Sequence, residues 1–263
     1  MQLRTLQCAR DLAWLSNPRV RLSKACAWYN SPCVMRMLQA APVLHLASLQ
    51  MDSADTAALG VLASLSMPQL TGLRLSSCPA LTSLAPLMAR QPQLRSLSLV
   101  TCHGLTSLCG LSSSLTLLQL WSCYSLTLDG FGAAAPPQLQ HFTLSSCPAI
   151  TSLHGLQGAV LRMLRRLGVS GLSLSSLQPL DLCDLRSLEH LNLESVSQLT
   201  SLHGLGAVPA LAVLIVSKCP VLCTLAPLFD VPRPALTTLM LMSCPRVVVA
   251  LGGIPASVAV SAK

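Results

Sequence analysis

One ten-residue stretch occurs twice in this chain with a single conservative change. Residues 75–84 read LSSCPALTSL, and residues 144–153 read LSSCPAITSL. A catalytic motif has no reason to be copied, whereas a structural unit that stacks on copies of itself recurs at a regular period. The duplication therefore indicates an architecture of repeated units.

The repeat extends well beyond these two stretches. Set in phase, the copies read L-x-x-L-x-L-x-x-C-x-x-L-x-x-L-x-x-L, and successive copies begin 21 to 25 residues apart. An earlier copy begins at Leu46, with Met51 at the third apolar position and Ala54 at the cysteine position. The other copies begin at Leu70, Leu94, Leu115, Leu139, Leu164, Leu188, Leu211 and Leu236.

The pattern within one copy predicts its local structure. In L-x-L, two leucines flank one residue, which is the period-2 signal of a short strand. One copy cannot bury its own apolar face, so the copies must stack on one another and place their strands in a single parallel sheet. Pro and Gly in the remainder of each copy favour a tight return without long helices. The expected fold is a helix-poor α/β solenoid.

This pattern resembles the leucine-rich repeat family, whose signature is L-x-x-L-x-L-x-x-N/C-x-L with a period of 20–29 residues. The resemblance covers about residues 46–250. Two residues rather than one separate the cysteine from the next leucine, as in CPAL at 78–81, which is similar to the cysteine-containing repeats. The short outer arcs are more similar to the phosphatase-regulator type. The resemblance implies a right-handed horseshoe with the sheet on its concave face.

Charge and repeat phase divide the chain into two parts. Residues 1–40 contain six basic side chains against Asp11, and so hold most of the formal net charge of +8. We expect residues 1–45 to form a basic N-terminal segment, either a helical cap or a degenerate repeat, and residues 46–263 to form about nine repeats. The last repeat is apolar and ends without a polar cap, so self-association through this end is expected. The outward residues of the last two strands include Val213, Ile215, Met240 and Met242.

Twelve cysteines suggest disulfides or a metal site, but their phase favours packing. Leu172 and Val196 occupy the cysteine position in two copies, which indicates a slot for a small buried hydrophobe. Neighbouring cysteines would lie near enough for a disulfide, but without a secretion signal we expect free thiols. The paired C-x2-C spacing of zinc sites is absent, and we expect no metal or other cofactor. The phased cysteines are Cys78, Cys102, Cys123, Cys147, Cys219 and Cys244.

Several function classes are disfavoured by sequence. The weakly polar stretch 247–260 is too short and too interrupted to span a membrane. The basic residues do not form a continuous patch with aromatic residues between them, which argues against nucleic-acid binding. Phosphate-binding and hydrolase motifs are missing, so we expect neither catalysis nor a small-molecule substrate. The N-terminus lacks the apolar run of a signal peptide, and we expect a cytoplasmic protein.

The repeat phase also predicts which residues face a partner. Residues before, between and after the L-x-L pair point outward on the concave face, and most of them are small. Trp121 is the exception, and interface energy concentrates in Trp, Tyr and Arg; the alternative is a surface Trp half-covered by Tyr124 with no partner. The predicted binding residues are Gln50, Asp52, Arg74, Gln119, Trp121, His141, Arg166, His190, Asn192 and Glu194.

The function expected from this pattern is a noncatalytic protein–protein interaction module that binds its partner on the concave face. Two alternatives stay open. In the first, the chain is a regulatory or substrate-recognition subunit of an enzyme complex, such as a ubiquitin-ligase adaptor or a phosphatase regulator, and residues 1–40 dock the catalytic partner. In the second, it is a secreted or surface leucine-rich-repeat antigen whose signal peptide lies upstream.

Overall fold

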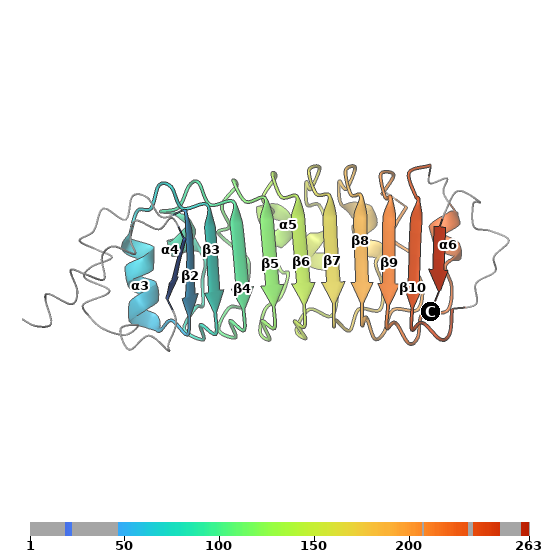
Figure 1. Ribbon diagram of the computed structural model, residues 1–263, viewed down its shortest axis with the longest axis horizontal. Coiled ribbons are helices and arrows are strands. Elements are labelled where there is room, and N and C mark those ends of the chain that lie inside the picture. Colours follow the sequence, from blue (N-terminus) through green and yellow to red (C-terminus); the bar gives the residue numbers. More distant parts are fainter. Residues whose placement is uncertain (1–18, 23–46, 207, 231–233, 248–258, 263) are drawn as a thin grey trace, which may run out of the picture.

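A single parallel sheet runs the length of the molecule. The computed structural model describes residues 19–22, 47–206, 208–230, 234–247 and 259–262, and its strands lie side by side in chain order from β1 to β11 (Figure 1). The expected helix-poor solenoid with one parallel sheet is confirmed. The strands are β1 Arg19–Leu22, β2 Ser48–Asp52, β3 Gly72–Ser76, β4 Ser96–Val100, β5 Leu117–Trp121, β6 His141–Ser145, β7 Arg166–Ser170, β8 His190–Glu194, β9 Val213–Ser217, β10 Thr238–Met242 and β11 Ala259–Ala262.

Each of the strands from β2 to β10 contains one L-x-L-type pair in the expected phase. In β3, Leu73 and Leu75 are fully buried while Arg74 between them is exposed. The same alternation recurs along the sheet, and the next leucines of each copy fill the interior of the coil. Because successive strands pair residue for residue, every leucine stacks on its counterpart in the neighbouring coil. The core is therefore one continuous column of apolar side chains.

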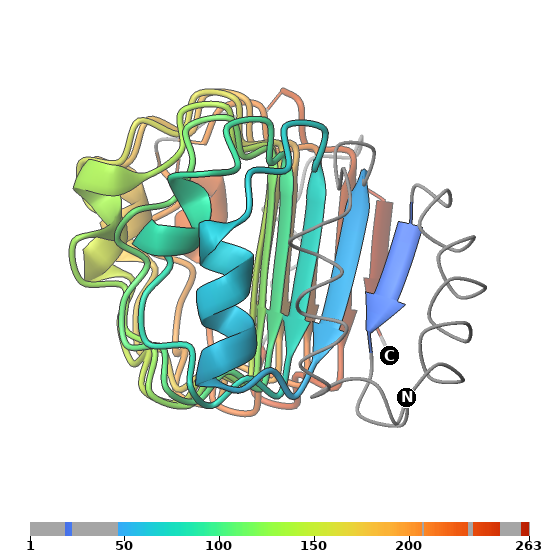
Figure 2. The same cartoon turned by 90° about the vertical axis from the view of Figure 1, so that its left-hand side faces the viewer.

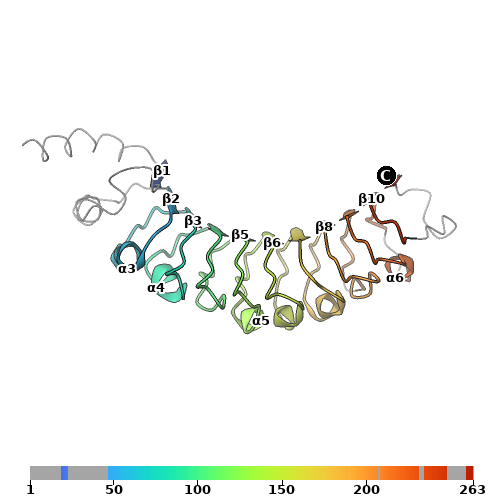
Figure 3. The same ribbon diagram turned by 90° about the horizontal axis from the view of Figure 1, so that it is seen from below.

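The outer arcs contain short helical segments (Figure 2). The longest, α3 Thr56–Ser64, begins where the Asp55 carboxylate accepts a hydrogen bond of 2.8 Å from the Ala58 amide, and it buries Ala58, Leu59 and Leu62. The others span one or two turns, so each coil is thicker on its outer side than at the strand. The molecule consequently curves with the sheet on the concave face (Figure 3). These segments are α4 Ala85–Met88, α5 Phe131–Ala134, η3 His154–Leu156, η4 Gln178–Leu182 and α6 Ala226–Phe229.

The residue that follows each strand from β2 to β10 has a positive φ. Ser77 (φ 51°) and Ser146 (φ 53°) are examples, and Gly171 (φ 62°) takes this position in its copy. Their amides donate to the last carbonyl of the next strand, as in the 2.7 Å bond from Ser77 to Val100. This left-handed residue turns the chain away from the sheet and keeps neighbouring coils in register.

Close packing between outer arcs explains the recurring glycines of the HGL triplets. A Cβ added at Gly104 would overlap the carbonyl oxygen of Pro79 in the preceding coil, and one added at Gly155 would overlap that of Leu128. Only a residue without a side chain allows the backbones to approach so closely. The coils are thus in contact on the outer side as well as through the sheet.

Two strands lie outside the repeats that define the solenoid. β1 belongs to the basic segment 1–45 and pairs in parallel with β2, while β11 pairs with β10. The rest of residues 1–45, for which a helical cap or a degenerate repeat was expected, and residues 248–258 lie outside the described residues. The sheet therefore continues by one strand beyond each end of the repeats. Over the described ranges, no helix has the length and apolar character required to cross a membrane.

Candidate interaction surface

The pairing register turns the outward positions into three rows that cross the sheet. One row joins the first residues of the strands, one the middle residues and one the last residues. His141, Arg166 and His190 occupy consecutive places in the first row, whereas Trp121 is in the last row opposite Ser145. All ten predicted binding residues take outward positions. The three first-row residues and Trp121 lie at opposite edges of the concave face.

At the N-terminal end, the outward side chains bind one another. The Gln50 amide donates to the Asp52 carboxylate over 3.3 Å. The Arg74 guanidinium donates to the Ser98 hydroxyl of the next strand, also over 3.3 Å. The other outward residues of β2, β3 and β4 are serines, Gly72 and Val100, so this third of the face is mostly polar.

An aromatic group lies at the carboxyl edge of β4 and β5. Trp121, the last residue of β5, keeps 44% of its surface exposed, and Tyr124 in the following loop keeps 53%. Tyr124 stacks on His103 from the preceding coil, with ring centroids 4.5 Å apart and planes 18° apart. The ring of Tyr124 is therefore held by a neighbouring coil, and Trp121 remains open to solvent beside it. We call His103, Trp121 and Tyr124 the aromatic cluster.

One cationic and two protonatable side chains lie at the amino edge of β6, β7 and β8. His141, Arg166 and His190, which we call the cationic row, stand opposite one another in the register. Partial burial lowers the pKa of His141, and the charges of Arg166, Arg165 and His190 lower it further. The neutral imidazole of His141 is thus favoured near pH 7.

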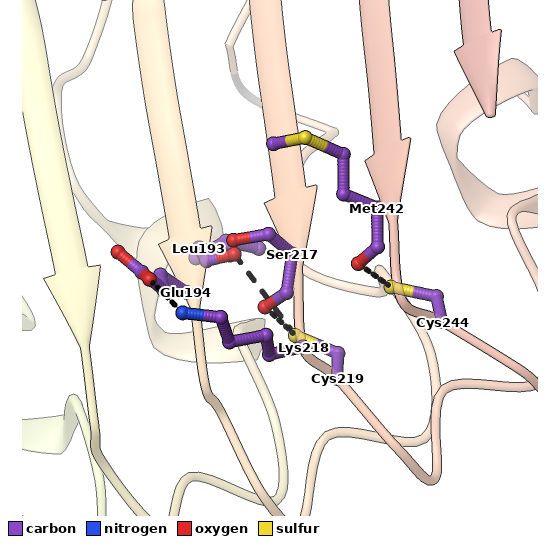
Figure 4. Close-up of polar contacts among 7 residues, drawn as sticks. All are labelled: Leu193, Glu194, Ser217, Lys218, Cys219, Met242 and Cys244. Carbon is purple, nitrogen blue, oxygen red and sulfur yellow. Dashed lines mark hydrogen bonds and ion pairs between the residues drawn. The ribbon is translucent and has the colours of Figure 1, made fainter. Parts of the chain in front are cut away.

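The C-terminal third of the face is mostly apolar. Val213 and Ile215 are half-buried, whereas Met240 and Met242 expose 37% and 39% of their surfaces. Next to them the Lys218 ammonium donates to the Glu194 carboxylate over 2.9 Å (Figure 4). Glu194 therefore has an internal cationic partner, and Asn192 in the middle of β8 is exposed.

Beneath the carboxyl edge runs the column of phased cysteines. The thiol of Cys219 donates to the carbonyl of Ser217 over 3.4 Å, and the Cys244 thiol donates to Met242 over 3.5 Å (Figure 4). Sulfur–sulfur hydrogen bonds to Cys123, followed by burial, raise the pKa of Cys102 and Cys147. Burial raises the pKa of Cys219 to about 11. Cys102, Cys147 and Cys219 are therefore protonated at neutral pH, and a protonated thiol is a poor nucleophile and metal ligand. Hydrogen bonds from the neighbouring thiols lower the pKa of Cys78 and Cys123 instead.

The packing interpretation of the phased cysteines agrees with their burial. The nine cysteines within the described ranges are free, and the phased ones are buried except for Cys244, which is half-buried. Over the same ranges, no group of three or more His, Cys, Asp or Glu residues could hold a metal ion. The sequence prediction did not include His103, Arg165 or Lys218. His103 and Lys218 lie past the L-x-L positions, and only the folded structure shows that they contact Tyr124 and Glu194.

The one-strand repeat, the parallel ladder and the buried cysteine position define a leucine-rich-repeat solenoid. The leucine-rich repeat domain of the type III effector XopL superposes with a TM-score of 0.54 at 20% identity, over 98% of this chain and 82% of that chain. TLR13, solved in a complex with ssRNA13, superposes with a TM-score of 0.56 at 22% identity, over 80% of this chain and 29% of that chain.

An internalin (InlF) from Listeria monocytogenes aligns at 18% identity with a TM-score of 0.41, over 86% of this chain and 76% of that chain. No protein-family model matches the sequence, and no curated protein matches it. The similarity is one of fold, and the chain has the leucine-rich-repeat fold.

Proposed function

We propose that the chain is a noncatalytic protein-binding module whose partner docks on the concave face. The observation that carries this proposal is Trp121, which is 44% exposed at the carboxyl end of β5, about midway along the strand order of the sheet. Burying such a ring in the core would have required a leucine position, and position 121 is an outward one. An exposed Trp on a face of small residues has the character of an interface hot spot, where truncation costs a complex about 2 kcal/mol or more.

The surrounding surface supports a macromolecular rather than a small-molecule partner. The outward residues nearest Trp121 along the last row are Val100 and Ser145, and the face is an open curved sheet (Figure 3). An open surface of this kind offers extended contact area, whereas small ligands are usually held in concave pockets that bury most of their surface.

The experiment compares partner capture by the native chain and by Trp121→Ala. Affinity purification with quantitative mass spectrometry should yield proteins enriched on the native chain and lost on Trp121→Ala, while circular dichroism shows both folded. Leu182→Ala is the matched control, because Leu182 is a large exposed apolar residue on the outer arc. Equal capture by Trp121→Ala and the native chain would argue against the concave face.

We also propose a cytoplasmic location, supported by the free thiols of the described cysteines. The test is a thiol titration of denatured protein isolated from its source without reductant. Twelve reactive thiols, equal to the cysteine count of the chain, are expected in a reducing compartment. A substantially lower number would favour the secreted or surface alternative.

A further inference from the structure

We propose that the cationic row binds an acidic segment of the partner protein. This inference rests on the proposed protein-binding function and specifies the chemistry of the partner. Three cationic or protonatable side chains project from the first position of three adjacent strands. At the usual strand spacing, the row spans roughly 10 Å. The face is concave, so outward side chains of neighbouring strands converge on the same volume (Figure 3).

Charge balance on the face supports an anionic occupant. The Arg165 guanidinium lies 3.7 Å from the Glu189 carboxylate, and Lys218 is paired with Glu194. Arg166 projects between the two histidines, and among the described residues no carboxylate forms an ion pair with it. A carboxylate from a partner would therefore find a guanidinium with its donors available, the geometry that Arg recognises best.

The cations grouped around His141 also favour an anionic occupant. His141 faces Arg166, Arg165 and, one strand further, His190, while on the β5 side it stands opposite the uncharged Leu117. Glu189, just before β8, is the acidic residue near this group and is paired with Arg165. Proton uptake by His141 is opposed by these cations in the free protein. A bound carboxylate would offset the repulsion between these cations and a protonated His141. Binding of the carboxylate is therefore coupled to protonation of His141.

The aromatic cluster sets a second contact for the same segment. Arg166 is two strands from Trp121 and four residues away along the strand direction. At usual sheet spacings the two positions are about 16 Å apart. An extended chain covers this distance in about five residues. The segment that matches both contacts has an acidic pair and, about five residues away, a large apolar side chain.

The test uses a fluorescein-labelled peptide of twelve residues in which glutamates alternate with serines. Matched probes carry glutamine in place of every glutamate, or are oligouridylate RNA of similar length. Fluorescence anisotropy should show the glutamate peptide binding about tenfold more tightly than the glutamine peptide at low salt. Arg166→Glu should lose this preference. Arg90→Glu, with the same charge change at an exposed site outside the sheet, should retain it.

Affinity for the glutamate peptide should also rise by about three- to tenfold between pH 8 and pH 6, because a bound carboxylate favours the protonated form of His141, whose pKa partial burial and the neighbouring cations lower in the free protein. Glutamate carboxylates stay ionised over this range. A His141→Gln variant should show a flatter profile. This pH response separates the row from a merely nonspecific positive surface, whose arginines and lysines do not titrate between pH 6 and 8.

Three results would overturn the proposal. They are equal binding of the glutamate and glutamine peptides, equal effects of Arg166→Glu and Arg90→Glu, and tighter Arg166-dependent binding of the RNA than of the glutamate peptide. The last result would make the row a phosphate contact. If captured partners depend on Trp121 but not on Arg166, only this inference fails. If they depend on neither residue, the proposed function fails as well.

Discussion

The Nζ of Lys218 lies 2.9 Å from Oε1 of Glu194, so the side chain that follows β9 pairs with the last residue of β8. Both groups are solvent-accessible, and exposed ion pairs contribute about 0–1 kcal/mol to stability. Glu194→Gln and Lys218→Met should therefore show a coupling in this range in a double-mutant cycle measured by urea unfolding. Added salt should reduce the coupling, and a value well above about 1 kcal/mol would contradict an exposed pair.

Loss of a phased cysteine should cost stability without affecting binding. Cys102 and Cys147 are fully buried and contact backbone carbonyls of their own and the preceding coil. Cys102→Ala or Cys147→Ala should lower the free energy of unfolding by about 1–2 kcal/mol through the lost sulfur contacts. Cys109→Ala, at an exposed site, is the control and should change it little. A folded Cys147→Ala protein that no longer bound its partner would refute a purely packing role.

Stability should decline above about pH 9. Burial raises the pKa of Cys219 to about 11, compared with 9.0 for a free thiol. Between these values the unfolded chain loses the proton while the folded chain retains it, so the stabilisation present below pH 9 is lost as the pH rises toward 11. Thermal melts from pH 8 to 11 would measure this decline. Cys219→Val, which copies the Val196 of the preceding repeat, should make it shallower, whereas Cys223→Ser at an exposed site should not.

Adding one methyl group should have opposite effects at two glycines. Gly104→Ala places a Cβ against the Pro79 carbonyl of the neighbouring coil and should destabilise the protein by about 1–3 kcal/mol. Gly60→Ala lies within α3 with no atom nearby, and should stabilise by about 0.5–1 kcal/mol through helix propensity. Chemical denaturation of both variants would measure the difference. Equal effects would mean that the outer arcs are not in close contact.

The apolar C-terminal third should promote self-association. Met240 and Met242 are exposed on neighbouring outward positions of β10. Replacing both with serine should shift the protein toward monomer in sedimentation velocity across a concentration series, because exposed apolar patches favour association. Met163→Ser, at an exposed site outside the sheet, is the control. A native chain that remains monomeric at high concentration would rule this association out.

Much of this fold could be predicted because a repeat supplies the same information many times. Leu73 and Leu75 alone would fit a strand or a helix, but the same pair at regular spacing admits only stacked strands. The phase therefore placed each strand from β2 to β10, and with it the outward position of Trp121. The strands β1 and β11 follow no such pattern, and their sequences RVRL and AVSA are too short to indicate a strand by themselves.

The candidate surface was less predictable, because contacts across coils depend on register and loop path. The sequence placed His141, Arg166 and His190 on successive strands together with Trp121. It did not separate them into the two edges of the sheet, since this requires comparing positions within each strand. His103 and Tyr124 each follow the phased cysteine of adjacent copies, but the stacking of their rings depends on how the two loops lie.

The residue-for-residue register of the strands also bears on how such a chain changes through time. The stretches LSSCPALTSL and LSSCPAITSL begin with the last two residues of β3 and β6 and continue into the same kind of turn. Recombination between gene segments encoding them would remove or duplicate three whole coils and recreate an equivalent junction. A single genetic event could therefore lengthen or shorten the sheet, and each remaining coil would still pack on a neighbouring coil with the same repeat pattern.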